Sequence, residues 1–336
     1  MRIWFNHWFS TAYHLINMIK DGDPDKFYFI GTSTNPVAMY KKVCDEWYDE
    51  KDGLTAEEYI DFCLNFCKEH NVDVFVPRRY LVEIVNHREQ FEEIGVKIFA
   101  HDDAEIIVIL DDKQKTYDYF KQIDTDIIPE ILIAHSFDEF CSGYEKLQQL
   151  YERVCYKLVI DEGARSFRVI DNKIDTIKGV LEKPGSKVTY GMAKQILSQY
   201  DFSNPMLLMP YLSGVEISVD CLATSSDNLI IPRYKTNKRY SEVIFGEDIM
   251  KKCNHIMNFL KVKMPMNIQF KINDGKLYLL EINPRMSGGL QLSCKATGIN
   301  LPSIAMNQLL GKEIKWEYPK FDSRKVAHIE TPVIVG

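Results

Sequence analysis

A carboxylate and an amide lie two residues apart at the end of a stretch, residues 277–282, that reads as a β-strand. Because side chains alternate along a strand, Glu281 and Asn283 share one face, while Leu280 and Ile282 point to the other. Carboxylate and amide oxygens are ligands for a hard cation. Mg²⁺ takes few of them, because water and substrate phosphate complete its octahedron. The pair therefore predicts a magnesium site that also receives a phosphate.

The residues after this strand suit an anionic ligand. Arg285, at the end of the strand, can clamp a phosphoryl group. Ser287, Gly288 and Gly289 let the backbone approach a ligand closely, because glycine has no Cβ. The alternative is a plain hairpin whose glutamate caps a loop and whose arginine lies at the surface, and for an isolated E-x-N pair that alternative is favoured.

The full string changes this balance. The sequence LLEINPRMSGG, followed by KATG, resembles the ATP-grasp superfamily, and most closely the synthetase domains of carbamoyl-phosphate synthase, where E-x-N-P-R precedes a K-A-T-G-like segment. The resemblance is strong over residues 110–312. It implies ATP and Mg²⁺ as cofactors, with Mn²⁺ as an alternative, and Gln269 as a further metal or phosphate ligand. Arg285 is then the candidate for stabilising an acyl phosphate.

The place of Gln269 depends on the loop around Asp274 and Gly275. A two-residue loop pairs residue 273 with 276 and puts Gln269 opposite Leu280, on the wrong face. A three-residue loop with a left-handed Gly275 pairs 272 with 276 and brings Gln269 to the face of Glu281 and Asn283, because a one-residue slip inverts every side chain. We predict the three-residue loop.

The resemblance implies further nucleotide ligands upstream. Lys113, at the start of a helix, and Lys157, late in a strand, match two phosphate-neutralising lysines of the family. Residues 162–168 occupy the place of the flexible loop that covers the phosphates. Such loops carry several glycines, whereas this one has only Gly163, so we expect Arg165 and Ser166 to supply donors instead.

The segment LLMPYLSGVEISVD resembles the hinge of the family, with Met209 in a position that is often acidic. The resemblance implies that Glu216 contacts the ribose hydroxyls. The backbone and side chains that would surround the adenine are those of Leu208, Met209, Tyr211 and Leu212. The alternative is a buried central strand with Glu216 at its exposed end.

Three cations follow one another on a later strand and its end, and we consider them for an acidic substrate. They are Arg233, Lys235 and Arg239. A solvated, charged strand end explains them equally well. Arg78 and Arg79 follow an N-terminal strand at the edge where open sheets bind ligands, and Arg78 is the weaker candidate there. His7 follows the first strand, and we interpret it as a structural or surface histidine.

The elements that position these residues indicate an α/β protein. Strands at residues 3–5, 27–30, 72–76 and 97–99 alternate with helices, which is typical of a parallel sheet. No G-x-G-x-x-G follows the first strand, so a dinucleotide site is not expected there. From residue 205 the strands follow one another with few helices, which indicates an antiparallel sheet. We predict a Rossmann-like pre-ATP-grasp domain over 1–111 and an ATP-grasp domain with a small lobe, 112–205, and a large lobe, 206–336.

The composition excludes several classes of protein. The 336 residues carry 41 Lys and Arg against 48 Asp and Glu, a net charge of −7, which argues against nucleic acid as an obligate partner. No apolar run is long enough to span a membrane, and no signal peptide begins the chain. The eight cysteines are scattered, which indicates reduced thiols and a cytoplasmic location. The oligomeric state is open, although dimers are common among similar enzymes.

The resemblance implies an ATP- and Mg²⁺-dependent, ADP-forming ligase that joins a small carboxylate to an amine through an acyl phosphate. Carboxyphosphate or carbamate chemistry stays open because of the likeness to carbamoyl-phosphate synthase. Two further alternatives are a nucleotide-binding regulatory module without turnover and a kinase with a stable phosphorylated product.

Overall fold

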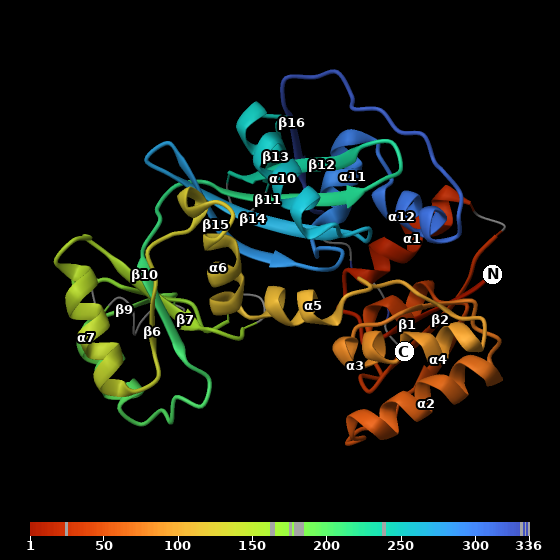
Figure 1. Cartoon of the computed structure of the whole chain (residues 1–336), viewed down its shortest axis with the longest axis horizontal. Coiled ribbons are helices and arrows are strands. Elements are labelled where there is room, and N and C mark those ends of the chain that lie inside the picture. The colour runs from red at the N-terminus through yellow and green to blue at the C-terminus, as the bar shows by residue number, and fades with distance from the viewer. Residues whose placement is uncertain are drawn as a thin grey trace. The chain divides into compact units, whose positions relative to one another are not determined.

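The computed structural model describes residues 1–23, 26–161, 165–174, 177, 185–236, 240–329, 332 and 334. The chain forms two compact units (Figure 1). Unit 1 comprises Met1–Val108, Glu216–Gln269 and Ile282–Gly336, and unit 2 comprises Ile109–Val215 and Phe270–Glu281. Among the helices described, none combines the length and the apolar character that a membrane span requires.

Unit 1 begins with the expected parallel sheet, in which five strands lie in the order β3-β2-β1-β4-β5. Alternate side chains of β1 face different helices: Ile3 and Phe5 pack with α1, whereas Trp4 packs with α2 and α4. The four predicted strands are confirmed, and β3 was not predicted. The elements are β1 (Arg2–Asn6), α1 (Ala12–Gly22), β2 (Tyr28–Ser33), η1 (Met39–Val43), β3 (Glu46–Asp49), α2 (Ala56–Glu69), β4 (Val74–Val76), α3 (Leu81–Asn86), α4 (Arg88–Glu93), β5 (Lys97–Ile98) and α5 (Ala104–Asp111).

The second sheet of unit 1 is antiparallel through four of its strands, β11, β12, β13 and β16, as the sequence predicts for the large lobe. Its full order is β15-β14-β11-β12-β13-β16, although residues Phe270–Glu281 of β14 and β15 are assigned to unit 2. The elements are β11 (Glu216–Ala223), β12 (Asn228–Lys235), β13 (Tyr240–Val243), α10 (Glu247–Leu260), β14 (Met266–Asn273), β15 (Lys276–Asn283), α11 (Leu290–Thr297), α12 (Leu301–Leu309) and β16 (Arg324–Ala327).

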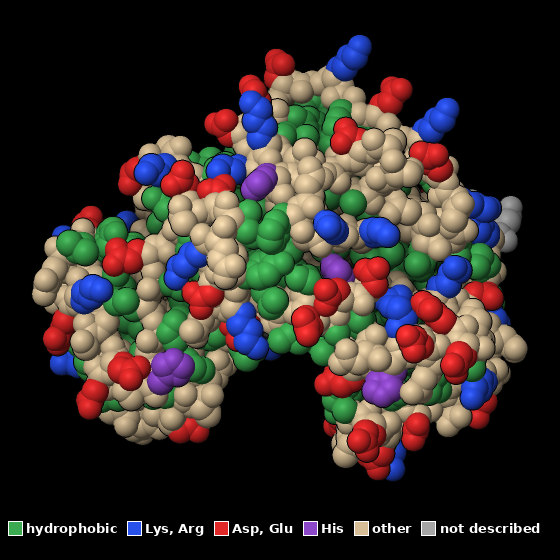
Figure 2. Space-filling view, in the orientation of Figure 1, with side chains coloured by type: hydrophobic (Ala, Val, Ile, Leu, Met, Phe, Trp, Pro, Cys, Tyr) green, Lys and Arg blue, Asp and Glu red, His purple; other side chains and the backbone are tan. Residues whose placement is uncertain are grey.

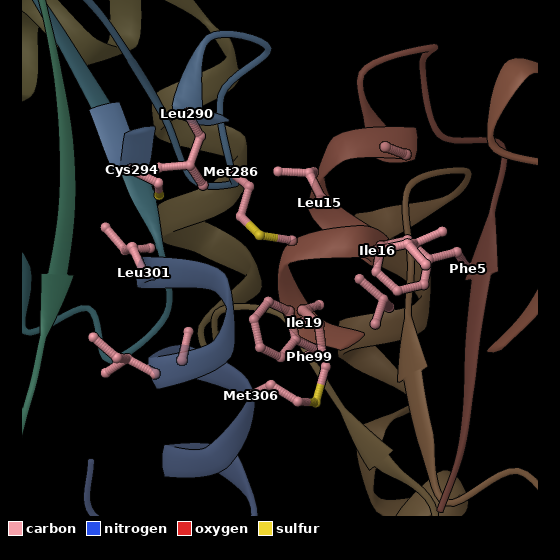
Figure 3. Packing of buried hydrophobic residues seen from close by; sticks show 14 of the residues in the cluster. Phe5, Leu15, Ile16, Ile19, Phe99, Met286, Leu290, Cys294, Leu301 and Met306 are labelled. Atoms are coloured by element: carbon pink, nitrogen blue, oxygen red, sulfur yellow. The ribbon is translucent and has the colours of Figure 1, made fainter. Parts of the chain in front are cut away.

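A single hydrophobic core joins the two sheets of unit 1. Figure 3 shows Leu15 of α1 facing Met286 from the loop before α11, while Ile16 lies beside Phe5 of β1 and Ile19 lies near Met306 of α12. The same cluster extends to buried residues of β11, β12 and β13. Residues from the predicted N-terminal domain, 1–111, and from the predicted large lobe, 206–336, therefore share one core. The domain boundaries at residues 111 and 205 remain a prediction.

Unit 2 is built on a smaller sheet of order β6-β10-β7-β8-β9, antiparallel except for the β8–β9 pair. The side chain of Ser136 caps α7 by accepting from Glu139 N at 3.2 Å. The carboxylate of Glu139 accepts from His135 N, one residue before the cap. The elements are α6 (Lys113–Lys121), η2 (Thr125–Ile127), β6 (Leu132–Ala134), α7 (Phe137–Gln148), β7 (Val154–Leu158), β8 (Arg168–Ile170), β9 (Lys187–Val188), α9 (Tyr190–Leu197) and β10 (Met206–Pro210).

The surface carries both signs of charge. On the face in view in Figure 2, acidic and basic side chains alternate over the described residues, with hydrophobic groups between them. This mixture matches the modest net charge of −7. All eight cysteines are free, and six of them are buried.

The shared core of unit 1 makes a test on α1 informative. We expect Ile16→Ala to lower the free energy of unfolding by about 2–5 kcal/mol, because it removes a buried side chain and leaves a cavity. Ile16 is 0% exposed, whereas Val37, the control position, is 56% exposed. Urea titration measures both variants, and Val37→Ala should stay within about 0.5 kcal/mol of the wild type. Equal effects of the two substitutions would contradict a core that includes α1.

Candidate active site

The hairpin that carries Glu281 differs from the prediction. β14 ends at Asn273 and β15 begins at Lys276, so the loop has two residues. Asp274 and Gly275 have φ angles of 50° and 75°, which is the pattern of a type I′ turn. The predicted three-residue loop is therefore wrong. Asp-Gly suits a type I′ turn because aspartate tolerates the left-handed region and glycine adopts it without steric cost.

The shorter loop removes the argument that grouped Gln269 with the metal ligands. Regular pairing from a two-residue loop puts Gln269 opposite Leu280, away from the face of Glu281. Its side-chain amide donates instead to Asn267 Oδ1 at 3.1 Å. Glu281 and Asn283 keep their relation, because both lie in β15 and alternate side chains share a face.

Arg285 lies two residues beyond β15. Its Nη1 donates to the carbonyl of Met286 at 3.3 Å, and its guanidinium carbon lies 5.1 Å from the centre of the Phe9 ring. The arginine is thus supported by an aromatic ring from the loop after β1, which belongs to the same unit.

The two predicted phosphate lysines of unit 2 are both buried. Lys113 is the first residue of α6, which Asp112 caps, and it is 6% exposed. Its Nζ donates to the carbonyl of Asp161 at 2.9 Å. Lys157, in β7, is 8% exposed. Such burial is rare for lysine, since a buried charge needs a partner.

Burial, and after it the positive charge of Lys113, lower the pKa of Lys157 from its ordinary 10.5 to about 8. Glu281, Cys155 and Asp161 act in the opposite direction but do not compensate. Two lysines and the carboxylate at the end of β15 therefore lie within one electrostatic neighbourhood of unit 2. An anion bound there would stabilise the charged form of Lys157.

The turn after β7 is held by a carboxylate that the sequence did not single out. Ser166 Oγ donates to Asp161 Oδ2 at 2.6 Å and accepts from Leu158 N at 2.9 Å. Ser166 is therefore committed to the turn. Arg165 is exposed, and its carbonyl accepts from Arg168. The single glycine of this loop, Gly163, lies outside the described residues.

The predicted adenine-binding segment begins in β10, and its side chains separate by face. Met209 is paired with Cys155 and Leu207 with Lys157, so these side chains lie on the lysine side of the sheet. Leu208 is 0% exposed and packs on the other side, in the core around α7. Its side chain therefore cannot enclose an adenine on the lysine face, contrary to the prediction.

The chain after β10 contains a position that only glycine can occupy. A Cβ at Gly214 would lie 1.6 Å from the carbonyl oxygen of Ile272. Tyr211 N donates to Arg153 O at 2.9 Å, and the Arg153 guanidinium stacks on the Tyr211 ring, while Leu212 is buried. The L-x-G-x-E pattern thus has a steric cause in its central glycine.

Glu216 and Lys235, predicted for ribose and substrate respectively, form an ion pair with each other. They are direct partners in the β11–β12 ladder. Lys235 therefore neutralises Glu216, and a substrate would have to compete for it. Arg239, the third cation of that group, lies outside the described residues.

Arg233 is 4% exposed rather than at a charged strand end. Its Nε donates to Ser293 Oγ at 3.3 Å and its Nη2 to Ser218 Oγ at 3.2 Å. A Cβ at Gly289 would lie 2.3 Å from Nη2. Arg233 thus packs beneath the Ser287–Gly289 loop and supports it. Its burial gives no support to the prediction that Arg233 contacts the substrate.

The same loop is anchored by Asp220, which sequence reasoning missed. Asp220 is 1% exposed and accepts from Ser287 Oγ at 2.7 Å, Ser293 Oγ at 2.6 Å and Asn267 Nδ2 at 2.9 Å. The alternation of Glu216, Ser218 and Asp220 along one strand face was the available signal. Ser287 is therefore a buried anchor, and the backbone of Gly288 and Gly289 is the part of the loop left for a ligand.

Comparison with known proteins agrees with this arrangement. A family profile described as "ATP-grasp in the biosynthetic pathway with Ter operon" matches residues 202–332, which include β15 and Arg285. The chain is 30% identical over 324 residues to the arginine-specific carbamoyl phosphate synthase large chain of Geobacillus stearothermophilus. The chain is thus similar in sequence to ATP-grasp proteins, over residues 202–332 for the family profile and over 324 residues for the Geobacillus protein.

These relatives are much longer than this chain. The alignment covers 91% of the chain and 28% of the Geobacillus protein. For the carbamoyl phosphate synthase large chain of Clostridium acetobutylicum, at 24% identity over 287 residues, it covers 80% and 25%. The chain thus spans about a quarter of the length of the relatives it matches.

Solved structures share the ATP-grasp fold at low identity. The biotin carboxylase domain of Hydrogenobacter thermophilus 2-oxoglutarate carboxylase, determined with MgADP and bicarbonate, has a TM-score of 0.66 at 12% identity, over 94% of this chain and 71% of that one. N5-carboxyaminoimidazole synthetase from Staphylococcus aureus, complexed with ADP, has a TM-score of 0.65 at 12% identity, over 94% and 78%.

The close approach at Gly214 gives a test of the ATP-grasp hinge. We expect Gly214→Ala to destabilise the protein by about 1–3 kcal/mol or more and to weaken ADP binding, because the added Cβ forces the backbone away from Ile272. Thermal unfolding and ADP titration measure the two effects. Gly191→Ala in α9 is the matched control, since the nearest atom to its Cβ is Thr189 Oγ1 at 3.9 Å. Indistinguishable variants would rule out a steric role for Gly214.

Proposed function

We propose that this protein is an ATP- and Mg²⁺-dependent ligase that activates a small carboxylate as an acyl phosphate and transfers it to an amine, releasing ADP and phosphate. The observation that carries the proposal is the buried lysine pair of unit 2, whose burial the neighbouring acidic groups offset only in part. A polyphosphate supplies the missing negative charge. The likeness to ADP-bound and MgADP-bound enzymes of the same fold supports this ligand.

The donor set fits a magnesium ion that is shared with a nucleotide. Glu281 and Asn283 offer two oxygen ligands from one strand face, and Mg²⁺ completes its coordination with water and phosphate oxygens. Among the described residues no cluster of three or more His, Cys, Asp or Glu could hold a metal by itself, so a site made with the nucleotide is the better match. When bound, the ion would stabilise charge on the transferring phosphoryl group. Mn²⁺ accepts the same oxygen ligands and is proposed as a substitute.

The remaining residues act by position and charge. Lys113 and Lys157 hold the phosphates, and the backbone around Met209 and Tyr211 borders the base. Arg285 and the loop Gly288–Gly289 orient the acid so that its oxygen attacks the γ-phosphate. No protein nucleophile is required. The sequence names neither the acid nor the amine, and it predicts a possible homodimer and a cytoplasmic location. We include bicarbonate among the candidate acids because the relatives are carbamoyl phosphate synthases.

Substitution of Glu281 tests the ligase proposal. We expect Glu281→Gln to reduce acid-dependent phosphate release about 10²-fold or more, because loss of the carboxylate weakens the hold on the metal. Phosphate release is measured with ATP, Mg²⁺ and a panel of amino acids and bicarbonate, with and without an amine. Glu247→Gln on the surface of α10 should match the wild type, because Glu247 is exposed and pairs with Lys251 one turn along the same helix. Nucleotide binding with no phosphate release for any acid would contradict the ligase and favour a regulatory module, and ADP formation without amine dependence would favour a kinase.

The lowered pKa of Lys157 predicts proton uptake on nucleotide binding. At pH 9 this lysine is largely neutral in the free protein, and nucleotide phosphate should raise its pKa, so that up to about one proton is taken up. Calorimetry in two buffers of different ionisation enthalpy measures the uptake. Lys157→Arg should bind nucleotide without it, because guanidinium stays charged at this pH.

Lys157 lowers the stability of the folded protein, whereas a lysine in an ordinary ion pair raises it. The folded protein binds fewer protons than the unfolded chain between pH 8 and 10.5, so Lys157 lowers stability below pH 8 and its penalty fades as the pH rises. Lys157→Met should therefore stabilise the free protein at pH 7, on the order of 1–3 kcal/mol. Unchanged stability and unchanged proton uptake in the variants would contradict a charged, buried Lys157 as the phosphate ligand.

A further inference from the structure

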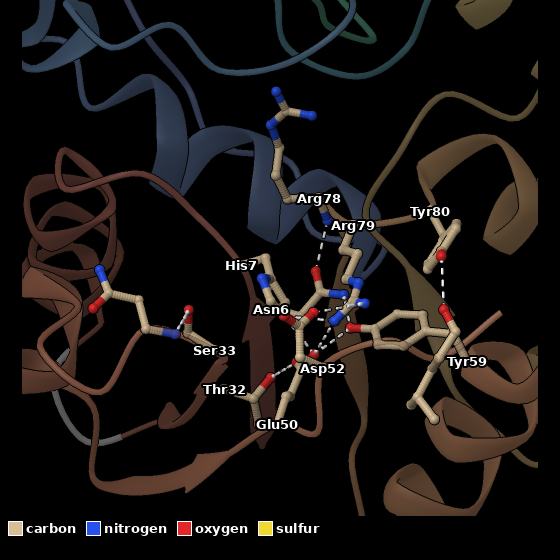
Figure 4. Close-up of polar contacts among 12 residues, drawn as sticks. Asn6, His7, Thr32, Ser33, Glu50, Asp52, Tyr59, Arg78, Arg79 and Tyr80 are labelled. Atoms are coloured by element: carbon tan, nitrogen blue, oxygen red, sulfur yellow. Dashed lines mark hydrogen bonds and ion pairs between the residues drawn. The ribbon is translucent and has the colours of Figure 1, made fainter. Parts of the chain in front are cut away.

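A polar cluster that none of these roles uses lies at the carboxyl edge of the N-terminal sheet (Figure 4). β1 is flanked by β2 on one side and by β4 on the other, so the strand order changes direction between β1 and β4. Open parallel sheets bind ligands at such a switch point. His7 directly follows β1, and Arg78 and Arg79 follow β4.

The centre of the cluster is Glu50, whose side chain is 1% exposed. Its carboxylate meets His7 Nε2 at 2.5 Å, Thr32 Oγ1 at 2.5 Å and Tyr59 OH at 2.9 Å. Arg79 Nη1 lies 3.5 Å away. A buried carboxylate is costly unless it is paired, and here four groups from four parts of the chain converge on it.

These contacts fix the tautomer of His7. Arg79 Nη1 lies 3.3 Å from His7 Nε2, and guanidinium nitrogens only donate. The shorter contact to Glu50 assigns a proton to Nε2, which donates it to the carboxylate. In the neutral imidazole, Nδ1 then carries the lone pair, and no described residue forms a hydrogen bond to it. The His7 side chain is 18% exposed, so solvent or a ligand can reach it.

The backbone at this position is held in an unusual conformation. His7 has φ 48°, in the left-handed region that residues other than glycine rarely adopt. Its N–H donates to Thr32 O at 2.9 Å, and the preceding Asn6 is fixed by Tyr59 OH at 2.8 Å and by Arg78 N at 2.6 Å. Strain of this kind concentrates at functional sites, where surrounding contacts enforce it.

Within unit 1 this edge adjoins the loop that carries Arg285. Trp8 and Pro77, from the ends of β1 and β4, line one small cavity together with Pro284 and Arg285. Phe9 supports the Arg285 guanidinium, and a Cβ at Gly288 would lie 3.7 Å from Thr11 Oγ1. The segment that begins with His7 is thus packed against the predicted acid-binding loop.

We propose that His7 is the base that deprotonates the amine substrate, with Glu50 as its positioning residue. This inference rests on the proposed ligase function. It identifies the second substrate of the ligase as a primary amine that arrives in its protonated form. His7 Nδ1 accepts one proton from the ammonium group, and the freed lone pair forms a bond to the carbonyl carbon of the acyl phosphate. The carbon–oxygen bond to phosphate breaks, its electron pair leaves on the phosphate oxygen, and that phosphate accepts the second proton from nitrogen.

Two nucleophiles separate this role from a structural one. Hydroxylamine is largely unprotonated at neutral pH and should capture the acyl phosphate as a hydroxamate without a base. An amino acid binds with its amino group protonated, so a base must remove a proton before the nitrogen can attack. We expect His7→Asn to keep hydroxamate formation within about 2-fold of the wild type and to lose amino-acid-dependent product about 10²-fold or more at pH 7.

Asparagine is chosen as the replacement for His7 because it tolerates the left-handed backbone conformation of this position better than most residues. His255→Asn, on the exposed face of α10, is the matched control and should resemble the wild type in both assays. The loss in His7→Asn should also shrink as the pH rises and the free amine becomes abundant. Glu50, Arg79, Tyr59 and Asp52 are the charged or titratable groups around this histidine, and all remain in the variant.

Glu50→Gln provides a second measurement that keeps the shape of the cluster. We expect it to lower kcat with the amino acid while leaving KM for ATP and hydroxamate formation unchanged, because the amide stabilises the imidazolium less. Equal losses with both nucleophiles, or full activity of His7→Asn with the amino acid, would overturn the assignment. A wild-type protein that forms no hydroxamate with any acid would overturn the ligase proposal itself, which is a different result.

Discussion

Burial of two like charges in unit 2 is the constraint on which the candidate site depends. Lys113 begins α6 and Lys157 lies in β7, and both side chains are almost fully removed from water. The Asp161 carbonyl and the charge of Glu281 offset this burial only in part, as the lowered pKa of Lys157 shows. The fold holds an electrostatic arrangement that is unfavourable when empty, so a polyanion relieves it on binding. Such preorganised charge is how phosphoryl transfer is stabilised.

The buried carboxylates of unit 1 show how structural and chemical roles differ. Asp220 receives three donors, all of them satisfied within the protein, and it anchors the loop that begins at Ser287. Glu50 also receives several donors, but one of them is a histidine with a second nitrogen. The hydroxyl and amide donors to Asp220 bond only within this network, so their role is to hold the conformation of the loop. His7 differs, because the imidazole that donates to Glu50 through one nitrogen can accept a proton from a ligand at the other.

Local patterns in the sequence predicted the elements well. The strands β1, β2, β4 and β5 form where the alternation of strands and helices predicts them. β3 was missed because it is a short edge strand rich in polar residues, Glu46–Asp49, which reads as a loop. Glu50 follows directly after it, so the N-terminal cluster was not visible in the sequence. The register of the late hairpin failed for a similar reason, because Asp274-Gly275 fits loops of either length.

The roles of charged residues were harder to predict, since they depend on partners distant in sequence. The sequence suggested either contact with an acidic substrate or a solvated strand end for Arg233 and Lys235. Instead, Arg233 lies beneath α11, whose Ser293 is 60 residues away, and Lys235 is paired with Glu216. Periodicity cannot reveal such partners. With these two cations engaged, the proposed recognition of an acid on the described part of unit 1 rests on Arg285 and the backbone of its loop. That loop packs against the segment after β1. This packing is the reason that we propose a role in the choice of the second substrate for the edge of the N-terminal sheet.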